Sequence, residues 1–202
     1  MADINTITDN SLDSISKVSE FDISNISKIA GINVNQGPGT PQEPIGYTAD
    51  LADTPANATG STHYSTGREV GNCFDDMNGG FKSGYVYHTT IAEAKWVQYD
   101  FGEGNEKQIR KYNITGPDDA TYYQGMAPKD WTFEGSNNAS DWDVLDTQSD
   151  QTVWTQDVFN EYEISHSTSY RYYKLNGIIS NWTDNGQSMM IGEIEMMEGI
   201  YE

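Results

Sequence analysis

The chain has 202 residues and a formal net charge of −20 at pH 7, with 31 Asp and Glu against 11 Lys and Arg. This excess of negative charge argues against nucleic acid as a partner and against an anionic membrane surface, because both attract clustered Lys and Arg. Cys73 is the only cysteine, which excludes an intrachain disulfide and a zinc site of paired cysteines. We expect Cys73 to be a small buried residue.

Neither a transmembrane helix nor a signal peptide is predicted. No run of residues is long and apolar enough to cross a membrane, and residues 1–4 lack the basic and apolar regions of a secretory signal. We therefore expect a protein that is kept soluble after synthesis, or one that is carried outside the cell on a larger assembly.

Residues 1–35 contain an internal repeat and neither Trp nor Tyr. Leu12–Val18 (LDSISKV) matches Ile23–Ile29 (ISNISKI) at an offset of eleven residues, and the apolar spacing of three predicts single helical turns. A segment this short cannot bury its apolar residues by itself. It either packs on the rest of the chain or docks into a partner or a self-associated stalk, and we favour the second alternative.

Residues 36–46 hold three of the six prolines and predict a linker. The domain organisation that follows is a repeat or anchor segment at 1–35, a linker at 36–46 and a folded domain at 47–202.

The folded domain is predicted to be built from strands. Val97, Tyr99 and Phe101 alternate with polar residues within 96–102, which is the pattern of a strand with one buried face. Residues 109–114 predict a second strand, and the two are expected to pair as a meander in a closed barrel or sandwich. Further strand patterns occur at 128–135, 142–146, 170–176 and 191–196, and we expect three tryptophans of these strand motifs in the core, namely Trp96, Trp131 and Trp142.

The order of these motifs resembles a known family. The segments WVQYDFG (96–102), PKDWTFEGSNNASDW (128–142) and YRYYKLN (170–176), followed by IGEIEM (191–196), are similar to the discoidin, or coagulation factor 5/8 type C, family. That family includes the galactose-binding-like modules of carbohydrate-binding module family 32. The resemblance covers residues 47–198 and implies an all-β fold, an eight-stranded antiparallel jelly roll, here with a short N-terminal anchoring extension.

The resemblance also implies one structural calcium ion. Members of the family hold it with an Asp in a turn near the start of the domain and a Glu in the last strand. The matching positions are Asp75, Asp76 and Asn78 in the turn and Glu193 in the strand. Hard oxygen ligands of this kind suit Ca²⁺, whereas the plainer alternative is a turn capped by its own side chain with a solvated Glu.

Ligand contacts are expected in loops at one end of the barrel, where an aromatic ring stacks on a sugar and polar groups bind its hydroxyls. The candidates are Tyr122 and Tyr123 in one loop, Trp182 in another, and His88 as a polar contact. For the aromatic residues the alternative is loop packing, and for His88 it is an ordinary surface histidine. No catalytic motif occurs, so an enzyme is not expected.

The N-terminal repeat is similar to N-terminal segments of tailed-phage virion proteins. This similarity implies a capsid decoration, head fibre or tail appendage that is located on the virion and attached to capsid or tail proteins through residues 1–35. The domain would then be displayed in many copies, or as a homo-oligomer, and would bind host surface glycans weakly. The alternatives are a structural cement protein without a sugar ligand and a carbohydrate-binding module of a cellular protein.

Overall fold

The structure is a computed structural model that describes residues 41–77, 87–89, 95–117, 124–181 and 188–202. The chain divides into two compact units, Met1–Thr40 and Pro41–Glu202, and all of the described residues belong to the second. Its strands are β1 (Gly46–Tyr47), β2 (Ala58–Gly60), β3 (Tyr87–His88), β4 (Lys95–Asp100), β5 (Ile109–Thr115), β6 (Pro128–Ser136), β7 (Asp143–Gln148), β8 (Asn160–Glu163), β9 (Tyr172–Ser180), β10 (Met190–Ile191) and β11 (Glu193–Ile200). Among the described residues, short 3₁₀ turns occur at η3 (Pro55–Asn57), η4 (Val70–Cys73) and η5 (Gln124–Met126).

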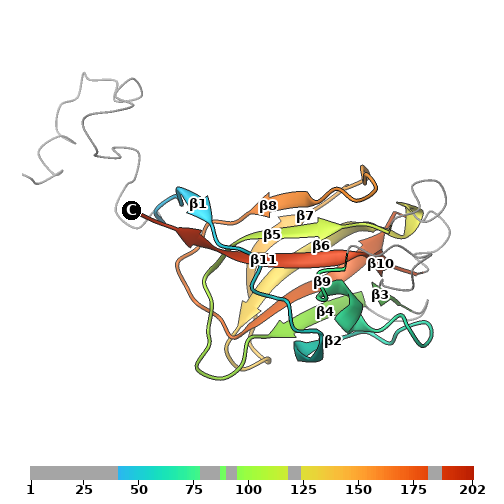
Figure 1. Cartoon of the computed structure of the whole chain (residues 1–202), viewed down its shortest axis with the longest axis horizontal. Helices are drawn as coiled ribbons and strands as arrows, with labels where there is room; N and C mark the ends of the chain where they lie inside the picture. The colour runs from blue at the N-terminus through green and yellow to red at the C-terminus, as the bar shows by residue number, and fades with distance from the viewer. Residues whose placement is uncertain (1–40, 78–86, 90–94, 118–123, 182–187) are drawn as a thin grey trace, which may run out of the picture. The chain divides into compact units, whose positions relative to one another are not determined.

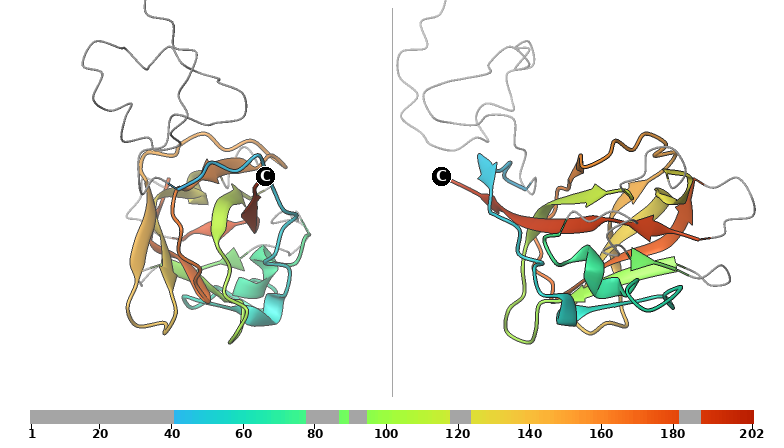
Figure 2. Two further views of the ribbon diagram at one scale, coloured as in Figure 1. Left: turned by 90° about the vertical axis from the view of Figure 1, so that its left-hand side faces the viewer. Right: turned by 45° about the vertical axis from the view of Figure 1, so that its right-hand side comes forward.

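The strands form two main sheets that face each other (Figures 1 and 2). One sheet has the order β1-β11-β5-β8 and the other β2-β4-β9-β6-β7, while β10 and β3 form a separate pair. All strand pairs are antiparallel. The all-β antiparallel expectation is therefore confirmed, and the described strands longer than two residues number eight. None of the described residues forms a helix that could span a membrane.

The expected meander of residues 96–102 with residues 109–114 is wrong. Both strands exist, as β4 and β5, but β4 pairs with β2 and β9, whereas β5 pairs with β11 and β8. Gly102 and Gly104 adopt positive φ angles of 93° and 78° in the segment that connects the two sheets. Alternation of apolar residues fixes which face of a strand is buried, but it does not fix the neighbouring strand.

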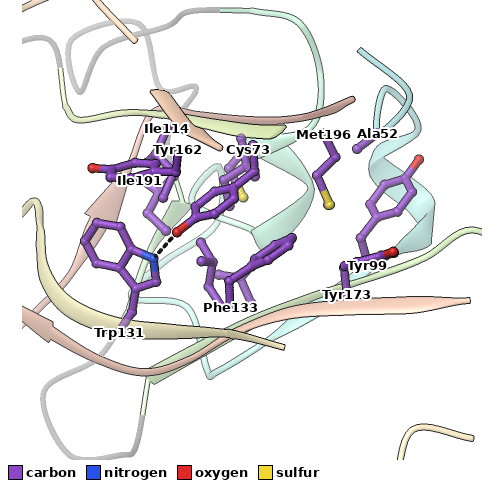
Figure 3. Close-up of a cluster of buried hydrophobic side chains, with 14 of the residues drawn as sticks. Ala52, Cys73, Tyr99, Ile114, Trp131, Phe133, Tyr162, Tyr173, Ile191 and Met196 are labelled. Carbon is purple, nitrogen blue, oxygen red and sulfur yellow. Dashed lines mark hydrogen bonds between the residues drawn. The ribbon is translucent and has the colours of Figure 1, made fainter. Parts of the chain in front are cut away.

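The core lies between the two sheets and is rich in aromatic rings. Val97 and Tyr99 are buried as the alternation predicts, and Phe101, just beyond β4, is half-buried with its ring against Tyr99. Tyr112 from β5 stacks on Phe133 from β6 at 4.2 Å between ring centroids, which joins the two sheets. Figure 3 shows aromatic side chains of both sheets pointing into this space.

Of the three tryptophans predicted for the core, only Trp131 is buried there. Trp96 and Trp142 are half-buried, and the prediction for them is wrong. Trp142 lies one residue before β7, and its ring is covered by the Lys174 ammonium at 3.8 Å from the centroid. Lys174 alternates with buried neighbours in β9, so this contact lies on the outer face of the sheet. Trp154, by contrast, is buried and donates a hydrogen bond to the Pro128 carbonyl.

The sandwich has two distinct ends. β11 begins with Glu193 opposite Thr115 of β5 and finishes with Ile200 opposite Gly46 of β1. Figure 1 shows β1 and the C-terminus at one end, called the strap end below, and β3 and β10 at the opposite end, called the loop end.

Candidate functional site

The segments that carry the predicted sugar-binding residues all depart from the loop end. The flanking described residues are placed there by strand register, since Lys95 lies opposite Ile178 and Ser180 lies opposite Pro128. Tyr122, Tyr123 and Trp182 themselves lie outside the described residues.

His88 is described only through its backbone, which forms part of β3 opposite Met190 of β10. The described residues that flank these candidates lie at one end of the sandwich, and the ligand roles of the candidate side chains remain predictions.

The interior at the loop end is polar, which sequence reasoning did not predict. Lys95 is only 6% exposed, and Ser180 and Thr115 are buried as well. The Oγ of Ser180 and the Oγ1 of Thr115 have no hydrogen-bond partner in the part of the chain that the structure describes. Burial also lowers the pKa of the Lys95 ammonium. Buried polar groups are costly unless they are satisfied, so the two hydroxyls are suited to a polar ligand or to bound water.

Glu193 is the most unusual residue of this region. Its side chain is 2% exposed, and neither carboxylate oxygen has a hydrogen-bond partner among the described residues. Burial, followed by the negative charges of Asp75 and Asp76, raises the pKa of Glu193 to about 9. An ionised Glu193 would therefore need a compensating positive charge.

The turn that follows η4 supplies two of the nearby carboxylates. Asp75 accepts a hydrogen bond from the Met77 amide at 3.0 Å, as in a turn capped by its own side chain. Asp76 adopts a φ of 56°, which an Asp tolerates in such turns. The pKa of Asp75 is raised, chiefly by burial and further by Asp76. The residues Asp75, Asp76 and Glu193, predicted from a resemblance, are thus electrostatically coupled.

Asp50 belongs to the same group, and sequence reasoning missed it. One oxygen accepts hydrogen bonds from the amides of Leu51, Ala52 and Met196, while the other is buried and has no partner within the described ranges. Burial raises the pKa of Asp50 to about 6. The sequence carries no local motif for Asp50, because its partner, the Met196 amide of β11, lies near the other end of the domain's sequence.

A divalent cation would compensate the unpartnered carboxylate oxygens of Glu193 and Asp50 if they were ionised. Buried carboxylate oxygens without hydrogen-bond donors are relieved when a hard cation supplies the missing positive charge. In the described part of the chain, no three or more His, Cys, Asp or Glu side chains converge closely enough to hold a metal by themselves. A cation would therefore be completed by other oxygens. Asn78, the remaining predicted ligand, lies outside the described residues.

Cys73, the single cysteine, is not suited to act as a nucleophile. Cys73 is fully buried, as predicted, and burial raises the pKa of its thiol. A buried, protonated thiol is a poor nucleophile. The acidic pair Asp141 and Asp143 is likewise engaged in structural hydrogen bonds, which Asn138 and the Tyr170 hydroxyl donate.

No family model matches the chain, and no curated protein matches it in sequence. Solved structures do match it. The lectin binding domain of Lectinolysin, complexed with Lewis b, has a TM-score of 0.60 at 14% identity, covering 76% of this chain and 99% of that one. A fucose binding module from Streptococcus pneumoniae has a TM-score of 0.58 at 17% identity, covering 78% and 99%.

A third match is CBM32-3 from a family 31 glycoside hydrolase of Clostridium perfringens, with a TM-score of 0.58 at 8% identity and coverages of 74% and 94%. At these identities the matches show the fold. They agree with the galactose-binding-like jelly roll that the motifs implied.

Proposed function

We propose that this chain is a carbohydrate-binding protein that recognises glycans at the loop end of its jelly roll and has no catalytic activity. The observation that carries the proposal is that the segments with the predicted sugar contacts depart from the same end where buried polar groups lack partners among the described residues. The similarity in fold to modules described as binding Lewis b and fucose supports this assignment.

Recognition would combine stacking with hydrogen bonds. Trp182 and the pair Tyr122 and Tyr123 would offer ring faces to a pyranose, and His88 would contact a hydroxyl. Such sites bind weakly one at a time, so useful attachment would depend on many copies.

We further propose one structural calcium ion bound by Glu193, with the turn of Asp75, Asp76 and Asn78 as the source of further ligands. Because no three acidic side chains of the described residues converge, other oxygens would complete its coordination. The ion would supply positive charge to the buried Glu193 carboxylate and would fix the turn after η4 against the start of β11. Its role is structural, and no step of recognition is assigned to it.

The test is a glycan array with the full chain displayed multivalently in calcium. Trp182→Ala and Tyr123→Ala are expected to reduce binding at least about tenfold, which corresponds to roughly 1.4 kcal/mol. Tyr172→Ala is the matched control, because Tyr172 lies on the outer face of the five-stranded sheet, beside Arg171. Binding that survives both loop substitutions, or no binding by a folded chain, would contradict the proposal.

The repeat in residues 1–35 supports a finer proposal about location. Its likeness to phage virion segments favours a protein attached to a capsid or tail in many copies, with its domain presented to host surface glycans. Deletion of residues 1–35 is expected to abolish attachment to particles while glycan binding persists. A cement protein without a sugar ligand would lose attachment in the same way, but it would bind no glycan either with or without residues 1–35.

A further inference from the structure

Arg110 closes the strap end of the sandwich. It lies in β5 between Ile109 and Lys111, where the register with β11 shifts, and it is only 2% exposed. A buried guanidinium is costly unless its donors are filled, so the identity of its partners is informative.

The partners of Arg110 come from both ends of the described unit. Its Nε donates to the Ile164 carbonyl at 2.8 Å, while Nη1 donates to the Gln42 carbonyl at 2.9 Å and to the Tyr201 hydroxyl at 2.7 Å. Nη2 lies 3.6 Å from the Glu43 carboxylate. The guanidinium thus joins residues 42–43, near the start of the unit, to residue 201 near its end.

Backbone contacts continue this arrangement. The segment 41–48, called the strap here, runs antiparallel to β11, with the Ile45 amide donating to the Ile200 carbonyl and the Thr48 amide to the Glu198 carbonyl. Gly199 allows the close approach, because a Cβ there would lie 2.7 Å from the Tyr201 hydroxyl and 2.9 Å from the Pro44 Cβ.

We propose that Arg110 anchors the strap to the sandwich. Its contacts fix the position and direction of the chain from Gln42 onward. Detaching the strap would break the charge-assisted hydrogen bond from Arg110 to the Gln42 carbonyl and its contact with Glu43, and the loss of these interactions opposes detachment. Only a planar fork reaches these separate acceptors, so Lys does not replace Arg. The anchored strap lies at the end opposite the loop end, and this proposal does not depend on what the loop end binds.

The test is amide hydrogen exchange on the full chain, comparing Arg110→Lys and Tyr201→Phe with the wild type. Both variants are expected to reduce the protection of the Ile45 and Thr48 amides at least about tenfold, with amides of β9 changed by less than about threefold. Lys129→Gln is the control. Lys129 lies in β6 near the loop end and forms an ion pair with the exposed Asp150, so its loss should leave the strap protected.

Two results would contradict the proposed role of Arg110 in holding the strap. Unchanged protection of Ile45 and Thr48 in both variants would show that the strap is held without Arg110. An equal loss of protection in the strap and in β9 would show that Arg110 contributes only general stability. If Arg110→Lys does not fold, Tyr201→Phe decides the question, because it removes a single acceptor and keeps the guanidinium.

Discussion

Glu193 makes the stability of the domain depend on pH in an unusual direction. Its pKa is raised from an ordinary 4.5 to about 9, so between these values the folded state binds more protons than the unfolded state. The free energy of unfolding therefore falls as the pH rises through this window. Asp50, with a pKa raised to about 6, contributes in the same sense at lower pH.

We predict that the melting temperature, measured in EDTA, falls between pH 5 and pH 8, and that calcium at pH 8 restores it. A cation present at 100 times its dissociation constant adds about 2.7 kcal/mol, which for a domain of this size is on the order of 5–10 °C. Glu193→Gln is expected to flatten the pH dependence and to remove most of the calcium response. A melting temperature that neither pH nor calcium changes would refute this account of Glu193.

A single glycine is predicted to be essential for packing. A Cβ at Gly135 would lie 2.5 Å from Cδ2 and 2.7 Å from Cγ of the Tyr170 ring, which is itself buried. Gly135→Ala is expected to lower the free energy of unfolding by about 1–3 kcal/mol in chemical denaturation. Gly46→Ala is the control, because nothing lies within 4 Å of a Cβ there. Equal stability of the two variants would show that the Tyr170 ring relaxes without cost.

At the level of elements, a chain of hydrogen bonds crosses the core and connects three strands. The Trp131 indole of β6 donates to the Tyr112 hydroxyl of β5 at 3.1 Å, and this hydroxyl donates to the Asp146 carboxylate of β7 at 2.6 Å. Tyr112 thereby joins the four-stranded sheet to the edge of the five-stranded sheet through polar contacts as well as through stacking.

Tyr112→Phe keeps the stacked ring but leaves the Trp131 indole nitrogen without its acceptor. We predict a loss of about 1–3 kcal/mol in the free energy of unfolding, because a buried donor without a partner bears its full desolvation cost. Tyr172→Phe is the comparison, since the Tyr172 ring, rather than its hydroxyl, contacts Arg171. Similar losses in the two variants would mean that the hydrogen-bond chain contributes nothing specific.

The strands were predictable from the sequence, whereas their partners were not. Alternation of Val97 and Tyr99 identified a buried face correctly, but β4 and β5 joined different sheets, because pairing depends on contacts far apart in the chain. Trp142 shows the same limit. Its apolar ring predicted burial, yet the ring lies on the outer face against the ammonium of Lys174, which forms an ion pair with Glu134.

The candidate cation site was predictable only in part, for the same reason. Asp75 and Glu193 could be named because they lie in motifs of a resembled family, and both are electrostatically perturbed in the structure. Asp50 could not, since its contact with Met196 joins positions at opposite ends of the domain's sequence. The hydroxyls of Ser180 and Thr115 have no hydrogen-bond partner among the described residues. The sequence could not predict this either, because their surroundings depend on tertiary packing.

At the scale of the whole sandwich, the two ends differ in how their buried charged side chains are paired. At the strap end, the buried Arg110 has its donors filled by chain segments. At the loop end, buried hydroxyls of Ser180 and Thr115 and both oxygens of Glu193 lack partners within the described ranges. Unpartnered buried atoms also occur at the strap end, where His166 Nδ1 has no partner within the described ranges, so the two ends differ in that the chain pairs the Arg110 charge but leaves the Glu193 carboxylate unpaired.

The overall charge of −20 predicts which glycans this domain prefers and how salt changes that preference. An acidic glycan approaches a field of like charge, and salt screens this repulsion over a Debye length of about 10 Å at 0.1 M. For chemically matched neutral and acidic glycans, we expect neutral ones to bind more tightly at low salt. Affinity for acidic glycans should rise several-fold between about 0.02 M and 0.3 M salt, while affinity for neutral glycans stays nearly constant, as measured by calorimetry in calcium. Acidic glycans that bind best at low salt would instead require a local cationic site, and Lys95, a buried cation of the loop end, would be the first residue to replace.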